Sequence, residues 1–559
     1  MSDRETLDPK ERPPGQLEIP EGLLWLLGAG AAEPPRIRAR TRRAAMSNFT
    51  AARRDGPSVK DKYYFKINIE QHVEWEKKSM SGTGSTFTSD SHMADSRNFY
   101  SLVDGSLFRD GSKFEVINPA TRGTAGTAIV PGAKVLQQAI EAAERAFVAW
   151  RAEQWKVRSS LLIALADVLR KNVEELARLL TLEQGKPLRQ AQDETISCAE
   201  FLEYCSLQEL RPVVLNSCAE AYAEQFFVPY GIVAGIVPWN FPLDAAISKI
   251  GPAIITGNSI IIKPAPTTPL ATLRFGELIK DVVPPGLVQI IADDGSLGPE
   301  LVSHPGIAKI SFTGSTTSGK AVMTSAAQGL KRLSLELGGN DPAIVFEDVD
   351  QESVAQAIFN AAFLNSGQVC TAIKRVYVHA AIADQFCERL ADLARNSVVG
   401  NGLDDNVTVG PLQNKAQLDK VLQYLDEAEK VGRIVVGGKA PDLAGYFIKP
   451  TIVTDISDEA ALVKDEQFGP ILPVLTFTDV DDVVRRANGT PFGLTASVWS
   501  ADTDRATRIA RRLDAGTVWV NKHREFNFDY PLSPCKESGF GAEGGIEGLT
   551  QYAQPRVLS

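Results

Sequence analysis

The sequence has few cysteines and no excess of basic residues, and both shortages limit what the protein can do. Six cysteines are scattered over 559 residues, without the close pairing of a zinc site or the density of a disulfide scaffold. We therefore assign no metal and expect free thiols in a reducing compartment. Cys198 and Cys205 lie seven apart in a helical stretch, and we interpret them as buried small apolar residues. The net charge is −10, so the sequence lacks the excess of basic residues that is typical of nucleic-acid-binding proteins. We therefore expect no nucleic-acid partner.

Long apolar runs are also missing. The longest ones, over 22–32 and over 259–262 with its flanks, fall short of the roughly 20 residues that a membrane span requires. We therefore predict a soluble, cytoplasmic protein with no membrane partner. A composition of 44% hydrophobic and 23% charged residues is ordinary for a globular enzyme of two or three domains.

Residues 1–92 differ in composition from everything after them. They combine a basic run at 36–43, proline pairs and a Gly/Ser/Thr stretch at 79–91 without a sustained period, so we expect a disordered extension. The basic run resembles a mitochondrial transit peptide, but acidic residues precede it, and transit peptides are poor in acids. Met46 and Met93 are both plausible starts. Because regular sequence begins soon after Met93, we hypothesise that the native product starts there, which N-terminal sequencing would test.

From Lys113 onward, helical and strand patterns alternate. A short strand and turn at 114–119 precedes amphipathic helices over 133–150 and 157–183. Short apolar runs separated by helical stretches are typical of parallel strands that helices cover on both faces. The sequence therefore predicts an α/β fold with two doubly wound parallel sheets. We expect strands at 231–237, 259–262, 287–291 and 308–312, and a second series at 342–345, 375–379, 434–437, 471–476, 496–499 and 517–521.

Two residues stand out as candidates for chemistry. Cys370 ends a helical run beside a glycine, where a side chain can face a cleft, although a lone free cysteine is usually an inert core residue. Glu336 lies among apolar residues in a strand-like alternation that ends in two glycines. Burial would raise its pKa toward neutrality, as a general base requires, whereas a solvated glutamate at a strand edge is the alternative interpretation.

Three further features could bind substrate or cofactor. Asn240 is framed by two prolines and could donate to an oxyanion, or it could simply bond to its own backbone in a turn. The Gly/Ser/Thr segment 311–319 follows a strand and opens a helix, so its amides could face a pyrophosphate, although it is not the usual Gly-x-Gly-x-x-Gly pattern. Lys263 ends an apolar strand, where open α/β sheets bind ligands.

Taken in the order in which they occur along the chain, the motifs around these residues strongly resemble those of the aldehyde dehydrogenase superfamily over 114–557. The chain is most similar to a little-characterised bacterial and fungal branch of that superfamily. The motifs are Pro-Trp-Asn-Phe-Pro (238–242), Lys-Pro (263–264), Phe-Thr-Gly-Ser-Thr (312–316), Leu-Glu-Leu-Gly-Gly (335–339), Gly-Gln-Val-Cys (367–370) and Glu-Gln-Phe-Gly-Pro (466–470).

The resemblance implies an enzyme that oxidises an aldehyde to a carboxylic acid through a thioester on Cys370. It implies that Asn240 and the Cys370 amide hold the oxyanion, that Glu336 activates water, and that Lys249 and Glu543 relay protons. It also implies a set of residues that bind NAD(P), namely Trp239, Lys263, Pro266, Gly314, Ser315, Gly319, Glu466 and Phe468.

The same resemblance implies domain limits and an assembly. We expect a Rossmann-like cofactor-binding domain over 93–336, a catalytic domain over 337–530, and a C-terminal segment over 531–559. A β-hairpin at 212–228, joined by the chain from about Gly548, resembles the arm that relatives lend to a neighbour's sheet edge. We therefore expect a homodimer or homotetramer.

The chain departs from the family pattern at several positions. Pro266 replaces a glutamate that bonds the adenosine ribose in many NAD-preferring relatives, so we expect NAD but keep NADP as the alternative. Asn340 also occurs in semialdehyde-oxidising relatives. The loop 521–535 should line the substrate entrance, where Cys535 is either a bystander or the partner of Cys370 in a regulatory disulfide. Transfer of the thioester to coenzyme A and a non-catalytic, cofactor-binding role are the rival functions, and the presence of Glu336 and its partners argues against both.

Overall fold

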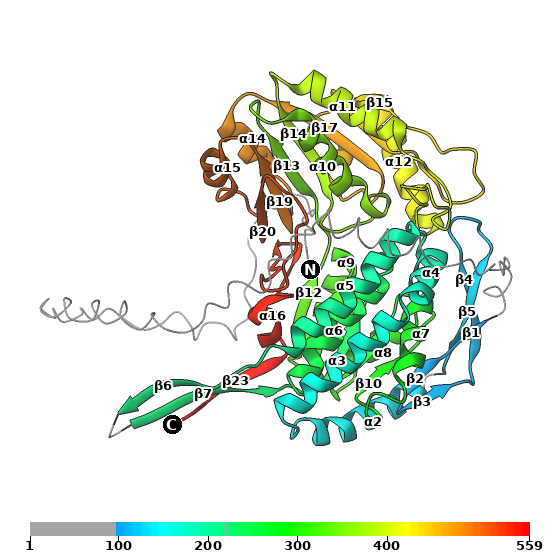
Figure 1. The fold of residues 1–559 in the computed structure, drawn as a ribbon, viewed down its shortest axis with the longest axis vertical. Helices are drawn as coiled ribbons and strands as arrows, with labels where there is room; N and C mark the ends of the chain where they lie inside the picture. Colours follow the sequence, from blue (N-terminus) through cyan, green and yellow to red (C-terminus); the bar gives the residue numbers. More distant parts are fainter. Residues whose placement is uncertain (1–96, 133, 219–220) are drawn as a thin grey trace, which may run out of the picture. The chain divides into compact units, whose positions relative to one another are not determined.

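The computed structural model describes residues 97–559 except 133, 219 and 220. The expected disorder of 1–92 and the proposed start at Met93 lie outside the described residues. The strands form two large sheets with helices around them (Figure 1), and the strands at the centre of each sheet run parallel. This arrangement confirms the prediction of two α/β sheets.

The first sheet has eight strands around a parallel centre. The neighbouring strands β12, β11, β8, β9 and β10 run parallel, whereas β22 at one edge and β2 and β3 at the other are antiparallel. β8, β9 and β10 are buried throughout, which explains their continuous apolar sequences. In sheet order the strands are β22 (Gly539–Phe540), β12 (Arg332–Glu336), β11 (Ile307–Thr313), β8 (Ile232–Ile236), β9 (Ser259–Lys263), β10 (Val288–Ile290), β2 (Ser101–Val103) and β3 (Ser106–Phe108).

One of the helices predicted around the first sheet is divided into two helices in the structure. The predicted helix over 157–183 breaks at Asn172, whose φ and ψ are −120° and 21°. The side chain of Asn172 donates to the carbonyl oxygen of Val168 over 2.7 Å, and such local bonds compete with the helical backbone. The helices are α2 (Lys134–Trp150), α3 (Trp155–Lys171), α4 (Val173–Gln184), α5 (Leu188–Ser206), α6 (Pro242–Ile255), α7 (Leu270–Ile279), α8 (Leu297–Ser303), α9 (Thr316–Ala327) and α16 (Gly545–Thr550).

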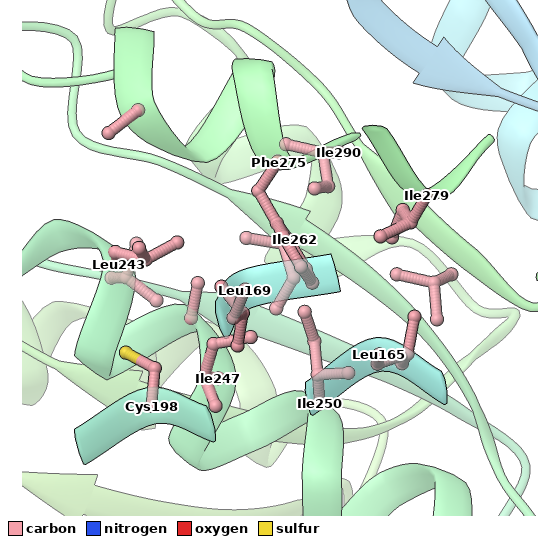
Figure 2. Close-up of a cluster of buried hydrophobic side chains, with 14 of the residues drawn as sticks. Leu165, Leu169, Cys198, Leu243, Ile247, Ile250, Ile262, Phe275, Ile279 and Ile290 are labelled. Carbon is pink, nitrogen blue, oxygen red and sulfur yellow. The ribbon is translucent and has the colours of Figure 1, made fainter. Parts of the chain in front are cut away.

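An apolar core joins these helices to the first sheet (Figure 2). Side chains from α3, α5, α6 and α7 meet side chains from β9 and β10, and none of those labelled is more than 1% exposed. Cys198 is one of them, and Cys205 is equally buried, as we predicted for both. Because α6 is packed on this core along its length, the polar side chains that it carries are held in fixed positions. The labelled residues are Leu165, Leu169, Cys198, Leu243, Ile247, Ile250, Ile262, Phe275, Ile279 and Ile290.

The second sheet has seven strands, and six of them run parallel to one another. The predicted strand at 434–437 is the exception, because β15 is an antiparallel edge. The strands are β15 (Arg433–Val436), β16 (Thr451–Thr454), β17 (Ile471–Phe477), β14 (Ile373–His379), β13 (Asp341–Val345), β19 (Thr495–Trp499) and β20 (Thr517–Val520). The helices are α10 (Gln351–Phe363), α11 (Ala383–Asn396), α12 (Lys415–Val431), α13 (Ala461–Lys464), α14 (Val480–Ala487) and α15 (Thr503–Ala510). No helix in the described ranges is long and apolar enough to span a membrane.

Three small sheets complete the described structure. The hairpin predicted at 212–228 consists of β6 (Val213–Cys218) and β7 (Ala221–Pro229), and β23 (Ala553–Leu558) pairs with β7 on its other side (Figure 1). We call these three strands the arm. The other two small sheets are β1 (Asn98–Phe99), β5 (Thr124–Val130) and β4 (Ser112–Ile117), and the pair β18 (Phe492–Gly493) and β21 (Cys535–Lys536).

Candidate active site

Cys370 lies in the connection between α10 and β14. A short 3-10 turn, Leu364–Gly367, precedes it, and the last three residues of this turn, Asn365, Ser366 and Gly367, have positive φ. A glycine is required at Gly367, because a Cβ atom there would lie 2.3 Å from the carbonyl oxygen of Gly469. The turn redirects the chain after α10 and leaves Cys370 partly exposed.

The electrostatic surroundings of Cys370 favour the neutral thiol. Burial raises the pKa of Cys370 to about 12, and the negative charges of Glu466, Asp341 and Glu336 act in the same direction. The positive charge of Arg524 acts against them. The thiol is therefore protonated at neutral pH and must lose its proton before it can act as a nucleophile.

Asn240 is fixed against the Cys370 loop. Its side-chain Nδ2 donates to the carbonyl oxygen of Gln368 over 2.9 Å. Its own carbonyl oxygen accepts from Lys186 Nζ and from Asn365 Nδ2, each over 3.0 Å. The alternative in which Asn240 bonds only its own backbone is therefore wrong. A side-chain amide carries two hydrogens, so one of them remains available to another acceptor.

Lys186, which the sequence analysis did not single out, holds Asn240 in place. It is fully buried, forms an ion pair with Glu194 and lies 3.7 Å from the centre of the Phe241 ring. The other oxygen of Glu194 accepts the backbone amides of Leu243 and Asp244 at the start of α6, each over 3.2 Å. The sequence feature that could have drawn attention to Lys186 is its position in a Gly-Lys-Pro turn. The residues that it contacts lie elsewhere in the sequence, so its role could not be predicted.

Glu336 ends β12 and is buried, with 6% of its surface exposed. It pairs in register with Thr313 of β11 on one side and with Gly539 of β22 on the other. Its Oε1 has no hydrogen-bond partner in the described part of the chain. Burial and then the negative charge of Glu543 raise the pKa of Glu336 well above its usual value, although Lys249 opposes them. The alternative of a solvated edge glutamate is therefore wrong.

Lys249 and Glu543 form an ion pair beside Glu336. Lys249 Nζ donates to Glu543 Oε1 over 2.9 Å and to Thr313 Oγ1 over 2.7 Å. The side chain of Lys249 is fully buried, whereas that of Glu543 is 23% exposed. The pair therefore acts on Glu336 electrostatically, and its Glu543 member is partly exposed to solvent.

The turn from β11 into α9 has the features of a pyrophosphate site. Ser315 caps α9 by accepting from the Ser318 amide over 3.2 Å, and Gly314 N donates to the carbonyl oxygen of Glu336 over 3.0 Å. A Cβ atom at Gly319 would lie 2.5 Å from Leu337 Cδ2, so only glycine lets the helix pack this closely. The free amides of a helix N-terminus favour an anion, so the residues present fit a dinucleotide.

Lys263 has a partner that the sequence analysis missed. Its Nζ donates to Asp293 Oδ2 over 2.9 Å, and both side chains are almost fully buried. Asp293 Oδ1 accepts the amides of Gly295 and Leu297, each over 2.9 Å, at the start of α8. Pro266 is partly exposed and offers no side-chain hydrogen bond to a ligand. The carboxylate nearest to Lys263 therefore comes from the end of β10, the strand beside β9.

The remaining predicted cofactor residues gather near the double glycine after β12. Glu466 Oε1 accepts the Gly339 amide over 3.0 Å. The rings of Trp239 and Phe468 meet edge to face, with centres 5.3 Å apart, and Lys374 Nζ lies 5.0 Å from the centre of the Phe468 ring. These contacts bring residues from both large sheets to one place. Among the described residues, no group of histidine, cysteine and acidic side chains could hold a metal ion.

The structure thus brings Asn240, Glu336, Glu466 and Arg524 around Cys370, with Lys249 and Glu543 behind Glu336. Lys263 and the β11–α9 turn lie on the first sheet, at the carboxyl ends of the parallel strands β9 and β11, between which β8 lies. Cys535 is an exposed free thiol in β21, and Cys370 is also free. A regulatory disulfide between them stays a prediction.

Comparison with known proteins agrees with this arrangement. Residues 108–558 match the model of the aldehyde dehydrogenase family. The NADP-dependent succinate-semialdehyde dehydrogenase of Escherichia coli is 37% identical over 82% of this chain and 99% of its own. A betaine aldehyde dehydrogenase of Sinorhizobium fredii is 38% identical over 82% of this chain and 96% of its own.

Solved structures extend the comparison to the fold. The structure of betaine aldehyde dehydrogenase from Staphylococcus aureus in complex with NAD+ superimposes with a TM-score of 0.79 at 32% identity, covering 82% of this chain and 94% of that one. Since the match extends over both sheets, it supports an assignment that rests on the whole described structure and not on one motif. The chain belongs to the aldehyde dehydrogenase family and is an NAD(P)-dependent oxidoreductase that acts on aldehydes.

Proposed function

We propose that Cys370 is the nucleophile of this aldehyde dehydrogenase, that Asn240 stabilises the oxyanion, and that Glu336 is the general base. The carboxyl of Glu336 carries the proposal. It is buried, one of its oxygens has no partner in the described part of the chain, and its charge influences the Cys370 thiol. A buried carboxyl with an unsatisfied oxygen is costly, and such groups concentrate where proton transfer is needed.

In the first step, Cys370 attacks the aldehyde carbon. Because the pKa of the free thiol is raised to about 12, Glu336 accepts the thiol proton as the sulfur–carbon bond forms. The carbonyl electron pair moves onto oxygen, and the second amide hydrogen of Asn240 and the Cys370 backbone amide donate to that oxygen. The product of this step is a thiohemiacetal on Cys370.

NAD(P)+, when bound, supplies the hydride acceptor that converts the thiohemiacetal carbon to the thioester level. Glu336 then removes a proton from water, and the resulting hydroxide attacks the thioester carbon. The sulfur–carbon bond breaks, the acid leaves, and Cys370 is regenerated. Hydrolysis requires Glu336 as a carboxylate, so the proton taken in the first step must leave beforehand.

Lys249 and Glu543 provide the route for that proton. Lys249 Nζ holds Glu543 Oε1 over 2.9 Å, and the partly exposed Glu543 can exchange protons with solvent. Because the negative charge of Glu543 raises the pKa of Glu336, the base retains protons into a higher pH range than an isolated carboxyl. The pair therefore couples the charge of the buried base to the solvent.

The cofactor residues follow the path of a dinucleotide. Glu466 and Phe468 would position the nicotinamide end, Gly314, Ser315 and Gly319 the pyrophosphate, and Lys263 and Pro266 the adenosine end. Trp239 belongs with the nicotinamide end rather than with the adenosine end, because its ring meets that of Phe468 edge to face. The exposed hydroxyl and amide groups at the start of α9 support the pyrophosphate assignment.

NAD is the favoured cofactor, with NADP as the alternative. Pro266 cannot supply the carboxylate that bonds ribose hydroxyls in many NAD-preferring relatives. Asp293 Oδ2 instead accepts Lys263 Nζ over 2.9 Å, so this lysine is already neutralised and is not free to bind a 2′-phosphate.

The sheets support the domain limits that we propose. All strands of the first sheet except β22 precede residue 337, which agrees with a cofactor-binding domain over 93–336. All strands of the second sheet lie within 341–520, which agrees with a catalytic domain over 337–530. The segment 531–559 contributes β22 to the first sheet and β23 to the arm.

The arm supports a homodimer or homotetramer. Its outer strands, β6 and β23, both have an open edge, and they carry exposed apolar side chains. An open edge with exposed apolar residues invites pairing with another chain. The exposed apolar residues of the arm are Val213, Val214, Leu215, Tyr222, Val557 and Leu558.

A cytoplasmic location stays a prediction from the sequence.

Three other functions remain as competitors. Transfer of the thioester to coenzyme A needs no general base, so the buried Glu336 argues for hydrolysis. A non-catalytic, cofactor-binding role is disfavoured by the intact set of Asn240, Glu336 and Cys370. A semialdehyde dehydrogenase of the succinate-semialdehyde type is a narrower form of the same activity, which the similarity to the Escherichia coli enzyme of that name supports.

The deciding experiment follows cofactor reduction by absorbance with the full chain. A panel of aliphatic, aromatic and carboxylate-bearing aldehydes is offered with NAD and with NADP, beside a Cys370→Ala variant. We expect the wild type to reduce cofactor and the variant to be silent. Retained turnover in Cys370→Ala would refute the assignment of the nucleophile, and cofactor binding without turnover on any aldehyde would favour the non-catalytic role.

A further inference from the structure

The loop after β20 places a cation beside Cys370 that the mechanism above does not use. His523 Nε2 lies 3.0 Å from the carbonyl oxygen of Thr371, and Arg524 Nε donates to Thr371 Oγ1 over 3.2 Å. Thr371 is buried and directly follows Cys370. Two consecutive loop residues therefore form hydrogen bonds with Thr371. These bonds hold the guanidinium of Arg524 close to Cys370.

Most of the hydrogen-bonding capacity of Arg524 is unused. A guanidinium has five N–H donors, and the one on Nε donates to Thr371. Neither Nη atom has a hydrogen-bond or ion-pair partner among the residues that the structure describes. Neither Nη atom is among the fully buried atoms that lack a partner, and the side chain of Arg524 is partly exposed.

Nearby acidic groups do not neutralise this cation. Asp244 and Asp341 act on Arg524 electrostatically, but neither forms an ion pair with it. Burial raises the pKa of Asp244 to about 7 and that of Asp341 to about 8, so a large part of each is uncharged at neutral pH. Within the loop, Glu525 pairs with Lys522 over 3.1 Å instead. The guanidinium of Arg524 therefore keeps its charge without an ion-pair partner among the described residues.

We propose that Arg524 binds a carboxylate carried by the substrate, so that the enzyme oxidises aldehydes that bear an anionic carboxylate at their other end. This inference rests on the proposed function, because it takes Cys370 as the attacking group. The planar guanidinium matches both oxygens of a carboxylate, and its two Nη atoms are free to donate. The carboxylate end is then anchored at the loop while the aldehyde end reaches Cys370.

A different role for Arg524 makes a different prediction. Its charge opposes the rise in the pKa of Cys370, so it could serve only to stabilise the thiolate. That effect would help every aldehyde equally, whether or not the substrate carries a charge. A carboxylate site, by contrast, discriminates between two substrates that share the same aldehyde group.

The test compares succinic semialdehyde with its methyl ester, which keeps the aldehyde but lacks the charge. Arg524→Gln should lower kcat/KM for the acid by about 100-fold, the range expected for a charged hydrogen bond, and for the ester by no more than about threefold. Arg524→Lys should recover part of the loss. Lys522→Gln, which removes a charge from the same loop without touching Thr371, should leave both substrates unchanged.

A binding measurement gives a readout without turnover. Succinate should bind to the Cys370→Ala protein in a calorimetric titration, and adding Arg524→Gln should weaken it by at least about tenfold. Equal losses for the acid and the ester, no preference of the wild type for the acid, or a preference for glyceraldehyde 3-phosphate would overturn the proposal. Turnover that survives in Cys370→Ala would instead refute the proposed nucleophile and leave the carboxylate site to be decided by the titration.

Discussion

Lys249 Nζ lies 2.9 Å from Glu543 Oε1, and this ion pair modulates the charge of the buried carboxyl of Glu336. The two members act in opposite directions, since Glu543 raises the pKa of Glu336 and Lys249 lowers it. Within the described part of the chain, neither residue is hydrogen-bonded to Cys370. The pair therefore affects the enzyme through the protonation of its base, which makes the pH profile the most direct measurement of its role.

Glu543→Gln should move the rise of kcat with pH to lower pH by about one unit. The base must be deprotonated to activate water, so activity rises as pH passes the pKa of Glu336. Removing the negative charge of Glu543 leaves Lys249 to stabilise the carboxylate, and the pKa of Glu336 falls. The same variant should lose about tenfold in maximal kcat, because the relay is interrupted. The profile is measured between pH 5 and 9.

Glu547→Gln is the matched control for this prediction. Glu547 is an exposed residue of α16, four residues after Glu543, and the substitution removes the same charge. Its profile should coincide with that of the wild type. A rise that stays in place or moves to higher pH in Glu543→Gln would contradict the assigned direction.

Alkylation of Cys370 in the cofactor-free enzyme should keep accelerating up to pH 10. Because burial raises its pKa to about 12, the thiolate fraction increases about tenfold per pH unit throughout this range. The measurement uses iodoacetamide and mass spectrometry in a Cys535→Ser background, since the Cys535 thiol is exposed. A plateau below pH 9 would show that the thiol is already activated in the resting enzyme.

The sequence predicted the parallel centre of each sheet because burial on both faces leaves continuous apolar runs. β8 and β9, for example, are apolar and fully buried. The antiparallel edges were not predictable in this way. β2 and β22 contain three and two residues, too few to show a period, and their partners are distant in sequence.

In the site, too, residues within short local motifs could be predicted, whereas contacts between residues distant in sequence could not. Cys370, Glu336 and Asn240 lie in short motifs and could be singled out from residue type and local context. The partner of Lys263 could not, because Asp293 follows it by 30 positions and meets it only because β9 and β10 are neighbours in the sheet. Arg524 was missed for a similar reason, since its contact with Thr371 joins residues 153 positions apart.

Leu215→Asp should convert the protein to monomers. Leu215 lies on β6, an edge strand of the arm, and its side chain is 54% exposed. An apolar residue at a paired strand edge loses its contacts when a charge replaces it. Val148→Asp on α2, at a site 64% exposed, is the control for the charge itself. Light scattering after size exclusion gives the mass, and identical masses for both variants and the wild type would argue against assembly through β6.

Asp293→Asn should raise the ratio of kcat/KM for NADP to that for NAD by at least about tenfold. The substitution keeps the shape of the side chain but removes the charge that lies 2.9 Å from Lys263 Nζ, so the lysine becomes available to a 2′-phosphate. Dissociation constants of both cofactors, measured by calorimetry without aldehyde, should change in the same sense. Asp294→Asn removes a neighbouring charge whose hydrogen bonds go to Ser296, including its amide over 3.1 Å, and it should leave the ratio unchanged. If both variants shift the ratio equally, the effect comes from net charge near the loop, and Asp293 does not select the cofactor.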